Sequence, residues 1–194
     1  MTKYFSSLFD PEVISLLNKG AVGVIPTDTV YGLVATAKSE HAINLLYSIK
    51  SRERQPGTII GASLDQLEDL GFLKESLVLA SRYWPNAVSV VMSSANIASY
   101  LSTGLSSLPA RIPNKPNLIN LLEQTGPLMT TSANAPKEPT STTVKMAQNY
   151  FGDTIDFYVD GGDLSNRPPS TIIGINHDNS ITVYRQGVVS INQD

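Results

Sequence analysis

Four short segments carry the residue types of a binding site, although they are scattered along the 194-residue chain. They are residues 26–32 (PTDTVYG), 50–52 (KSR), 130–134 (TTSAN) and 169–171 (PST). Each offers hydroxyls, amides or fixed cations beside Gly or Pro, at the edge of an apolar run. None contains a thiol or a pair of acids. This inventory favours a site that holds phosphate and carboxylate groups and orients a reaction, rather than one that performs covalent catalysis.

Each segment also has an ordinary structural explanation when it is considered alone. Residues 26–32 end a predicted strand, where open α/β sheets bind ligands, but Asp28 could equally bond its own backbone in a polar turn. The three cations of residues 50–54 could clamp a triphosphate, but cations at the end of a helix commonly complement its dipole. Residues 130–134 could hold phosphate in a backbone nest or cap a short helix.

Further polar residues lie near the later predicted strands. Arg111 interrupts the apolar, strand-like residues 108–113, where a buried arginine requires an anionic partner. A protein carboxylate and a ligand would serve equally. Ser170 and Arg185 flank the C-terminal strands and could be ordinary surface residues. The two histidines, at positions 41 and 177, are expected on a helix surface and in a loop, without a catalytic role.

Composition narrows the class of protein. The chain has 41% hydrophobic residues and a net charge of -3, which are typical of one globular domain covering residues 1–194. Its pI of about 5.3 argues against a broadly basic nucleic-acid surface, although Lys50, Arg52 and Arg54 leave room for a local basic patch. There is no cysteine, which excludes disulfides and a thiolate nucleophile. With no signal-peptide pattern and no run of about 20 apolar residues, we expect a cytoplasmic protein.

The elements that must position these residues alternate between helix and strand. Asp10 and Pro11 begin a helix that should end at Gly20, Ser39 caps another, and Ser63 with Gln66 forms a capping box. Helices are predicted at 11–20, 40–50, 63–71, 75–83, near 116–122 and at 143–150, and strands at 21–26, 33–37, 58–62, 87–92, 128–131, 157–159, 171–175 and 181–184. Residues 93–109 are expected to form a short helix and a loop, and the last two strands a hairpin. This pattern predicts an α/β fold with a mixed sheet.

In this order, the segments resemble the YrdC-like family, the threonylcarbamoyl-AMP synthases. The matching motifs are 26–33 (PTDTVYGL), 50–52 (KSR), 84–86 (WPN), 111–113 (RIP), 131–134 (TSAN), 169–171 (PST) and 185–187 (RQG). Any one motif is weak, but seven in the right order are specific and cover most of the chain. The resemblance implies a twisted mixed parallel/antiparallel sheet with helices on its faces and a large concave cavity. It also implies the short, single-domain form of the family.

The implied reaction joins L-threonine, bicarbonate and ATP into threonylcarbamoyl-AMP and releases pyrophosphate. The product would modify the adenosine beside the anticodon of certain tRNAs, through threonylcarbamoyl transferase proteins that receive it. No protein metal site is expected, and Mg²⁺ would bridge the phosphates. The resemblance assigns catalysis to Lys50 and Arg52, ATP binding to Lys50, Arg52, Arg54, Ser132, Asn134, Thr140 and Arg185, and threonine binding to Thr27, Tyr31, Arg111, Thr130 and Ser170.

The chain departs from the family pattern at two places. Arg54 stands where a lysine is common, and residues 84–86 lack the usual Trp-Pro-Gly-Pro sequence. Two other hypotheses stay open, because the family has a concave basic surface and because loop residues shape its acceptor pocket. One is a tRNA- or double-stranded-RNA-binding protein of the same fold, and the other is a paralogue that acts on a different carbamoyl acceptor.

Overall fold

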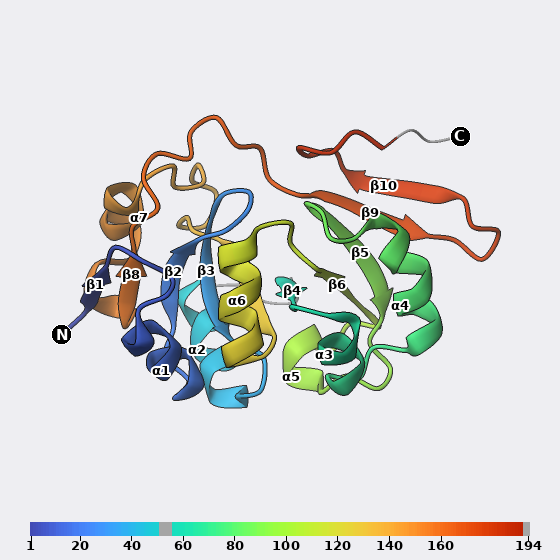
Figure 1. Cartoon of the computed structure of the whole chain (residues 1–194), viewed down its shortest axis with the longest axis horizontal. Coiled ribbons are helices and arrows are strands. Elements are labelled where there is room, and N and C mark those ends of the chain that lie inside the picture. Colours follow the sequence, from blue (N-terminus) through green and yellow to red (C-terminus); the bar gives the residue numbers. More distant parts are fainter. Residues whose placement is uncertain (51–55, 192–194) are drawn as a thin grey trace.

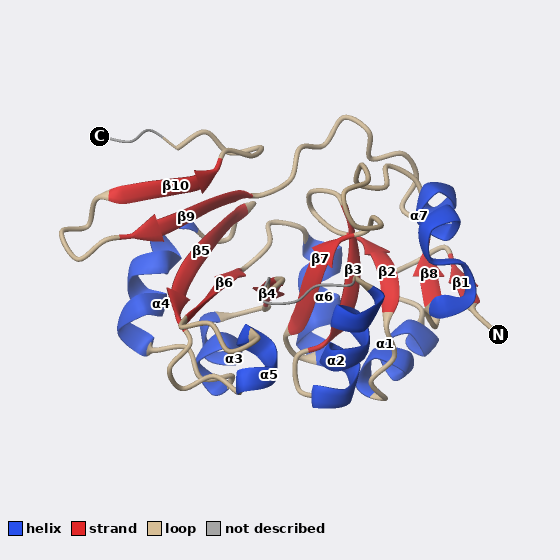
Figure 2. Cartoon of the chain, turned by 180° about the vertical axis from the view of Figure 1, so that it is seen from behind, coloured by secondary structure: helices blue, strands red, loops and turns tan. Residues whose placement is uncertain are grey.

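A single open sheet organises the molecule, shown from its two sides in Figures 1 and 2. The computed structural model describes residues 1–50 and 56–191. The sheet order in this part of the chain is β1-β8-β2-β3-β7-β4-β6-β5-β9-β10. The strands are β1 (Lys3–Phe5), β2 (Gly23–Pro26), β3 (Tyr31–Thr36), β4 (Thr58–Ile60), β5 (Val88–Ser93), β6 (Ser107–Arg111), β7 (Leu128–Ser132), β8 (Phe157–Val159), β9 (Thr171–Ile175) and β10 (Ile181–Arg185). Parallel and antiparallel pairs alternate irregularly, so the predicted mixed sheet is confirmed.

Helices cover both faces of the sheet (Figures 1 and 2). They are α1 (Pro11–Asn18), α2 (Glu40–Ile49), α3 (Leu64–Asp69), α4 (Lys74–Ala80), α5 (Ser99–Ser102), α6 (Pro116–Thr125) and α7 (Val144–Phe151), with 3₁₀ turns at Ser81–Tyr83 and Gly152–Thr154. Successive residues of a strand point to opposite faces. On β2, Ile25 packs with α1 and α6, whereas Val24 belongs to the cluster that contains α2. Two apolar cores therefore hold the sheet between helical layers.

Capping residues explain where several helices begin and end. The side chain of Asp10 accepts a hydrogen bond from Glu12 N, with Pro11 in the first helical turn. Ser39 accepts one from Ala42 N at the start of α2. Gly20 follows α1 with a φ of 87°, a backbone conformation that glycine adopts without strain. These predicted boundaries are confirmed.

Three expectations need correction. Strand β1 was not predicted, because three residues are too few for a periodic pattern. The loop expected up to residue 109 ends earlier, because β6 begins at Ser107, and the strand-like character of residues 108–113 is confirmed for 108–111. The capping box is only half formed, since Ser63 caps Gln66 N but Gln66 Oε1 accepts from Ala62 N instead of Ser63 N. In the described residues no helix is both long and apolar enough to cross a membrane.

Candidate functional site

Segments far apart in the sequence meet around one pocket with a volume of about 170 Å³. The turn between β2 and β3 contributes one wall, the ends of β7 and β10 and the starts of β4 and β9 contribute others, and β6 supplies Arg111. The predicted site residues that line it are Thr27, Tyr31, Arg111, Thr130, Ser132, Ser170 and Arg185. Lys50, Asn134 and Thr140 do not line it, and Arg52 and Arg54 lie outside the described residues. The fold therefore gathers all five residues expected to bind threonine.

The turn after β2 is closed by threonine hydroxyls. Thr27 Oγ1 donates to Val30 O at 2.6 Å and accepts from Thr29 N at 3.2 Å. Asp28 was considered as the residue that would bond its own backbone here, but its carboxylate binds Arg111 instead. The hydroxyl of Thr27 makes the hydrogen bonds that close this turn. The carboxylate of Asp28 is therefore left to bind Arg111 on the distant strand β6.

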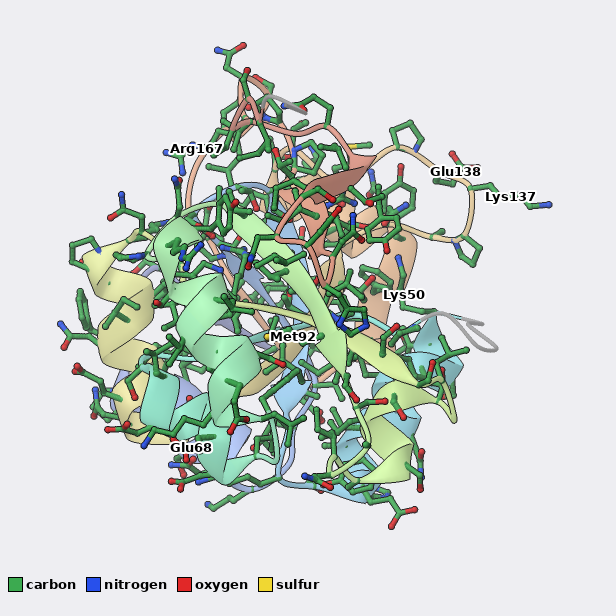
Figure 3. All side chains as sticks on the ribbon, turned by 90° about the vertical axis from the view of Figure 1, so that its right-hand side faces the viewer. Lys50, Glu68, Met92, Lys137, Glu138 and Arg167 are labelled. Atoms are coloured by element: carbon green, nitrogen blue, oxygen red, sulfur yellow. The ribbon has the colours of Figure 1, made fainter. Side chains whose placement is uncertain are left out.

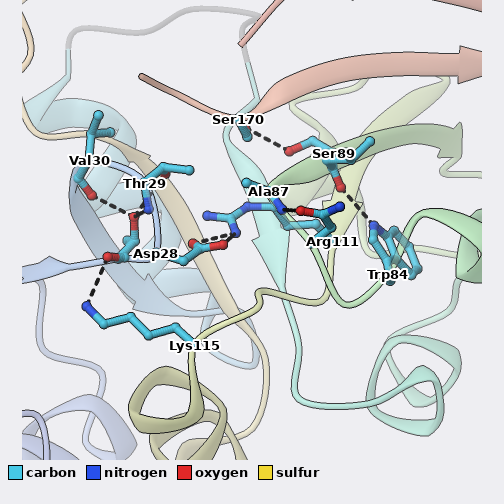
Figure 4. A network of polar contacts seen from close by, with 12 residues as sticks. Asp28, Thr29, Val30, Trp84, Ala87, Ser89, Arg111, Lys115 and Ser170 are labelled. Atoms are coloured by element: carbon cyan, nitrogen blue, oxygen red, sulfur yellow. Dashed lines mark hydrogen bonds and ion pairs between the residues drawn. The ribbon is translucent and has the colours of Figure 1, made fainter. Parts of the chain in front are cut away.

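Arg111 forms a buried ion pair across the site (Figure 4). Its Nη1 lies 2.6 Å from each oxygen of Asp28, and the two side chains are only 3% and 6% exposed. The anionic partner required by a buried guanidinium is therefore a protein carboxylate in this structure. Nε and Nη2 of Arg111 have no hydrogen bond to a described residue, and Arg111 lines the pocket. A ligand carboxylate and Asp28 could consequently use different atoms of one guanidinium.

Lys50, to which the resemblance assigns catalysis and ATP binding, is a buried residue. Lys50 is the C-cap residue of α2, is labelled in Figure 3, and is 2% exposed. Its Nζ donates to Ser132 O at 2.9 Å, to Asn134 O at 2.5 Å and to Asn134 Oδ1 at 2.9 Å. Ser132 Oγ also binds Asn134 Oδ1, at 2.7 Å. Lys50 therefore fixes the turn after β7, because an ammonium group carries three donors and the described residues of this turn place three acceptors beside it.

The start of β9 forms the opposite wall of the pocket. Ser170 is 7% exposed, and its Oγ lies 3.1 Å from Ser89 Oγ. Arg185 reaches back from β10 and donates through Nη2 to Ser170 O at 2.8 Å and to Ser170 Oγ at 3.1 Å. Gly187 packs so closely that a Cβ there would lie 2.2 Å from Pro169 O. Ser170 is thus held firmly, and the alternative that it is a surface residue is wrong.

Tyr31 lines the pocket, but its hydroxyl is hydrogen-bonded to the loop at residues 161–162. The side chain is fully buried, and its OH accepts from Gly161 N and donates to Gly162 O, both at 2.8 Å. Burial is the largest cause that raises the pKa of this phenol. Tyr31 therefore anchors residues 161–162, and its hydroxyl is already engaged where the sequence suggested a contact to threonine.

Three polar residues at or next to the site received no role from the sequence analysis. Thr131, which lies in the motif 131–134, lines the pocket, and its buried Oγ1 has no hydrogen-bond partner among the described residues. Lys115 donates to Thr27 O at 3.1 Å, and burial lowers its pKa. Ser89 gave a signal that could have been used, because it is a polar residue within the apolar strand β5. Lys115 gave none, since nothing in its sequence context distinguishes it from a surface lysine.

Sequence comparison finds a matching family model and named relatives. The Sua5/YciO/YrdC family model, described as "Telomere recombination", matches residues 15–187. The threonylcarbamoyl-AMP synthase of Pseudoalteromonas translucida is 31% identical over 166 residues, which cover 82% of this chain and 89% of the relative. That of Bacillus subtilis is 28% identical over 188 residues, which cover 92% of this chain and 54% of the relative.

Solved structures share the fold. P. abyssi Sua5 complexed with L-threonine superposes with a TM-score of 0.83 at 26% identity, covering 96% of this chain and 57% of that one. E. coli YciO superposes with a TM-score of 0.82 at 20% identity, covering 98% of each chain. The chain thus spans little more than half of the B. subtilis and P. abyssi proteins. Since the family model matches almost the whole chain, the protein belongs to the Sua5/YciO/YrdC family.

Proposed function

We propose that this protein is a threonylcarbamoyl-AMP synthase, folded as the single domain 1–194, which joins L-threonine, bicarbonate and ATP. The observation that carries the proposal is the pocket, where five family-motif segments meet: 26–33, 111–113, 131–134, 169–171 and 185–187. Relatives named for this activity are 28–31% identical to the chain. The product serves threonylcarbamoyladenosine modification of tRNA.

The reaction needs alignment and charge neutralisation more than a protein nucleophile. The amine of threonine takes up bicarbonate to give a carbamate, with loss of water. A carbamate oxygen then attacks the α-phosphorus of ATP, and the bond to the β-phosphate oxygen breaks to release pyrophosphate. Holding both substrates in line, beside groups that neutralise developing charge, accounts for several kcal/mol of barrier in such reactions.

The residue roles follow from the walls of the pocket. Thr27, Thr130 and Ser170 surround threonine, whose carboxylate takes the Nε and Nη2 edge of Arg111. Tyr31 contributes through its backbone and by fixing the loop 161–162, because its hydroxyl is engaged there.

ATP lies along the wall formed by β7 and β10. Ser132 and Arg185 hold phosphate oxygens inside the pocket, Asn134 and Thr140 hold nucleotide oxygens beyond its lining, and Arg52 and Arg54 neutralise the triphosphate. Lys50 does not line the pocket. It contributes indirectly, by fixing the turn at 132–134 and by adding positive charge close to that turn. The described residues contain no group of three His, Cys, Asp or Glu side chains that could hold a metal ion. We propose that Mg²⁺ enters bound to ATP, as part of the substrate.

The test is a pyrophosphate-release assay with each substrate omitted in turn, combined with mass spectrometry of the product. We expect release that requires both threonine and bicarbonate, and an ion of the mass of threonylcarbamoyl-AMP. Ser170→Ala should slow release, whereas Ser99→Ala, an exposed residue on α5, should not. Release at the same rate without threonine would overturn the assignment.

We also propose that proteins receive threonylcarbamoyl-AMP from this enzyme, that it contacts tRNA or double-stranded RNA directly, and that it is cytoplasmic. The pyrophosphate assay does not test these three proposals. An RNA titration at several salt concentrations tests direct binding, because phosphate contacts make affinity fall steeply as salt rises.

A further inference from the structure

We propose that Asp28 is a positioning residue for threonine recognition. Its carboxylate binds Nη1 of Arg111 and thereby orients the Nε and Nη2 edge of the guanidinium toward the substrate. This inference rests on the proposed function, and it concerns a residue that does not contact the substrate itself. Its basis is the buried ion pair between Asp28 and Arg111 in Figure 4.

The position of Asp28 relative to the pocket carries the argument. Its neighbours Thr27, Thr29 and Val30 all line the pocket, as does Arg111, whereas Asp28 is not among the lining residues. The Asp28 side chain is only 6% exposed, and its carboxylate binds Arg111. Asp28 therefore lies behind the guanidinium, and a substrate carboxylate could reach Arg111 without displacing it.

The geometry of the ion pair leaves the recognition edge open. Both oxygens of Asp28 approach Nη1, each at 2.6 Å, so the carboxylate takes one end of the guanidinium instead of the two-pronged edge. That edge, formed by Nε and Nη2, is the one that binds a second carboxylate with two parallel hydrogen bonds. A guanidinium fixed at one end loses less conformational entropy when a ligand binds the other.

Neighbouring charge allows two carboxylates to share one arginine. Lys115 lies close enough to Asp28 to interact electrostatically with it, and its Nζ binds Thr27 O, next to Asp28 in the chain. Arg167 also acts electrostatically on Lys115, so among these described residues three cations, Arg111, Lys115 and Arg167, outnumber the one carboxylate of Asp28. An incoming threonine carboxylate therefore meets a site that remains positive, and Lys115 also fixes the turn that carries Asp28.

The test compares Asp28→Asn with wild type by titration calorimetry, using threonine and ATP separately, alongside melting curves. Asparagine keeps the size of the side chain but removes the charge that grips Arg111. We expect the threonine Kd to rise at least tenfold and the ATP Kd to change less than threefold. Asp156→Asn is the matched control, because Asp156 also accepts a hydrogen bond, from Val22 N, but does not line the pocket or contact Arg111. It should leave both constants unchanged.

The outcomes separate this inference from the proposed function. Wild-type protein that neither binds threonine nor makes threonylcarbamoyl-AMP would overturn both. Normal wild-type binding with an unchanged or lowered threonine Kd in folded Asp28→Asn would overturn the positioning role alone, and a lowered Kd would mean that Asp28 competes with substrate. If Asp28→Asn does not fold, Asp28→Glu takes its place. That variant keeps the charge but shifts the carboxylate by one methylene, and it should raise the threonine Kd at least threefold, with wild-type affinity counting against the role.

Discussion

Replacing Lys50 by methionine should weaken both the fold and the reaction. The substitution keeps an unbranched apolar side chain of similar reach but removes the ammonium group, which donates to Ser132 O, Asn134 O and Asn134 Oδ1. A hydrogen bond from a charged group contributes about 1.5–3 kcal/mol, and three on one atom are not additive. We therefore expect a loss of about 2–5 kcal/mol in the free energy of unfolding. At about 2–4 °C per kcal/mol for a chain of this length, the melting temperature should fall by at least about 4 °C.

Calorimetry and the pyrophosphate assay measure the two effects separately. Turnover should fall at least about tenfold, equivalent to ~1.4 kcal/mol, because the turn at 132–134 loses its support and the site loses a positive charge. Lys19→Met is the control, since Lys19 is an exposed residue at the end of α1 and surface changes usually stay within about 0.5 kcal/mol. A Lys50→Met protein that melts like wild type would refute the structural reasoning. A destabilised variant with an unchanged rate would refute the catalytic role and leave only the structural one.

Three further predictions concern other walls of the pocket. Arg111→Lys should raise the threonine KM strongly and the ATP KM much less, because lysine lacks the two-pronged edge; a lower melting temperature with unchanged threonine KM would mean that the pair with its carboxylate partner is purely structural. Gly187→Ala should lower the melting temperature by an amount equivalent to about 1–3 kcal/mol, since its Cβ would lie 2.2 Å from Pro169 O. A melting temperature unchanged from wild type would contradict the steric explanation. Thr131→Val should increase the free energy of unfolding by about 1 kcal/mol and so raise the melting temperature slightly, because it removes a buried hydroxyl that has no partner among the described residues. A clear decrease would indicate a partner for that hydroxyl.

Local signals in the sequence were sufficient to predict most helices and strands. The capping side chains of Asp10 and Ser39 and the glycine after α1 act within a few residues, so helix starts and ends could be predicted where these residues stand. The apolar runs that became β2, β5 and β7 were also recognisable. Strand β1 was not, because three residues carry little pattern and its pairing with β8 involves residues more than 150 positions away.

The sequence alone also determined which residue types could meet at a site, through the ordered motifs from residue 26 to residue 187. It could not decide what each of them binds. Arg111 and Asp28 are 83 residues apart and Lys50 and Asn134 are 84 apart, so their pairing depends on the strand order of the sheet. Burial decides the rest, because a cation removed from water must take the oxygens that the fold places beside it. Only the tertiary structure could therefore show that Lys50 fixes a turn and that Arg111 already has a carboxylate partner.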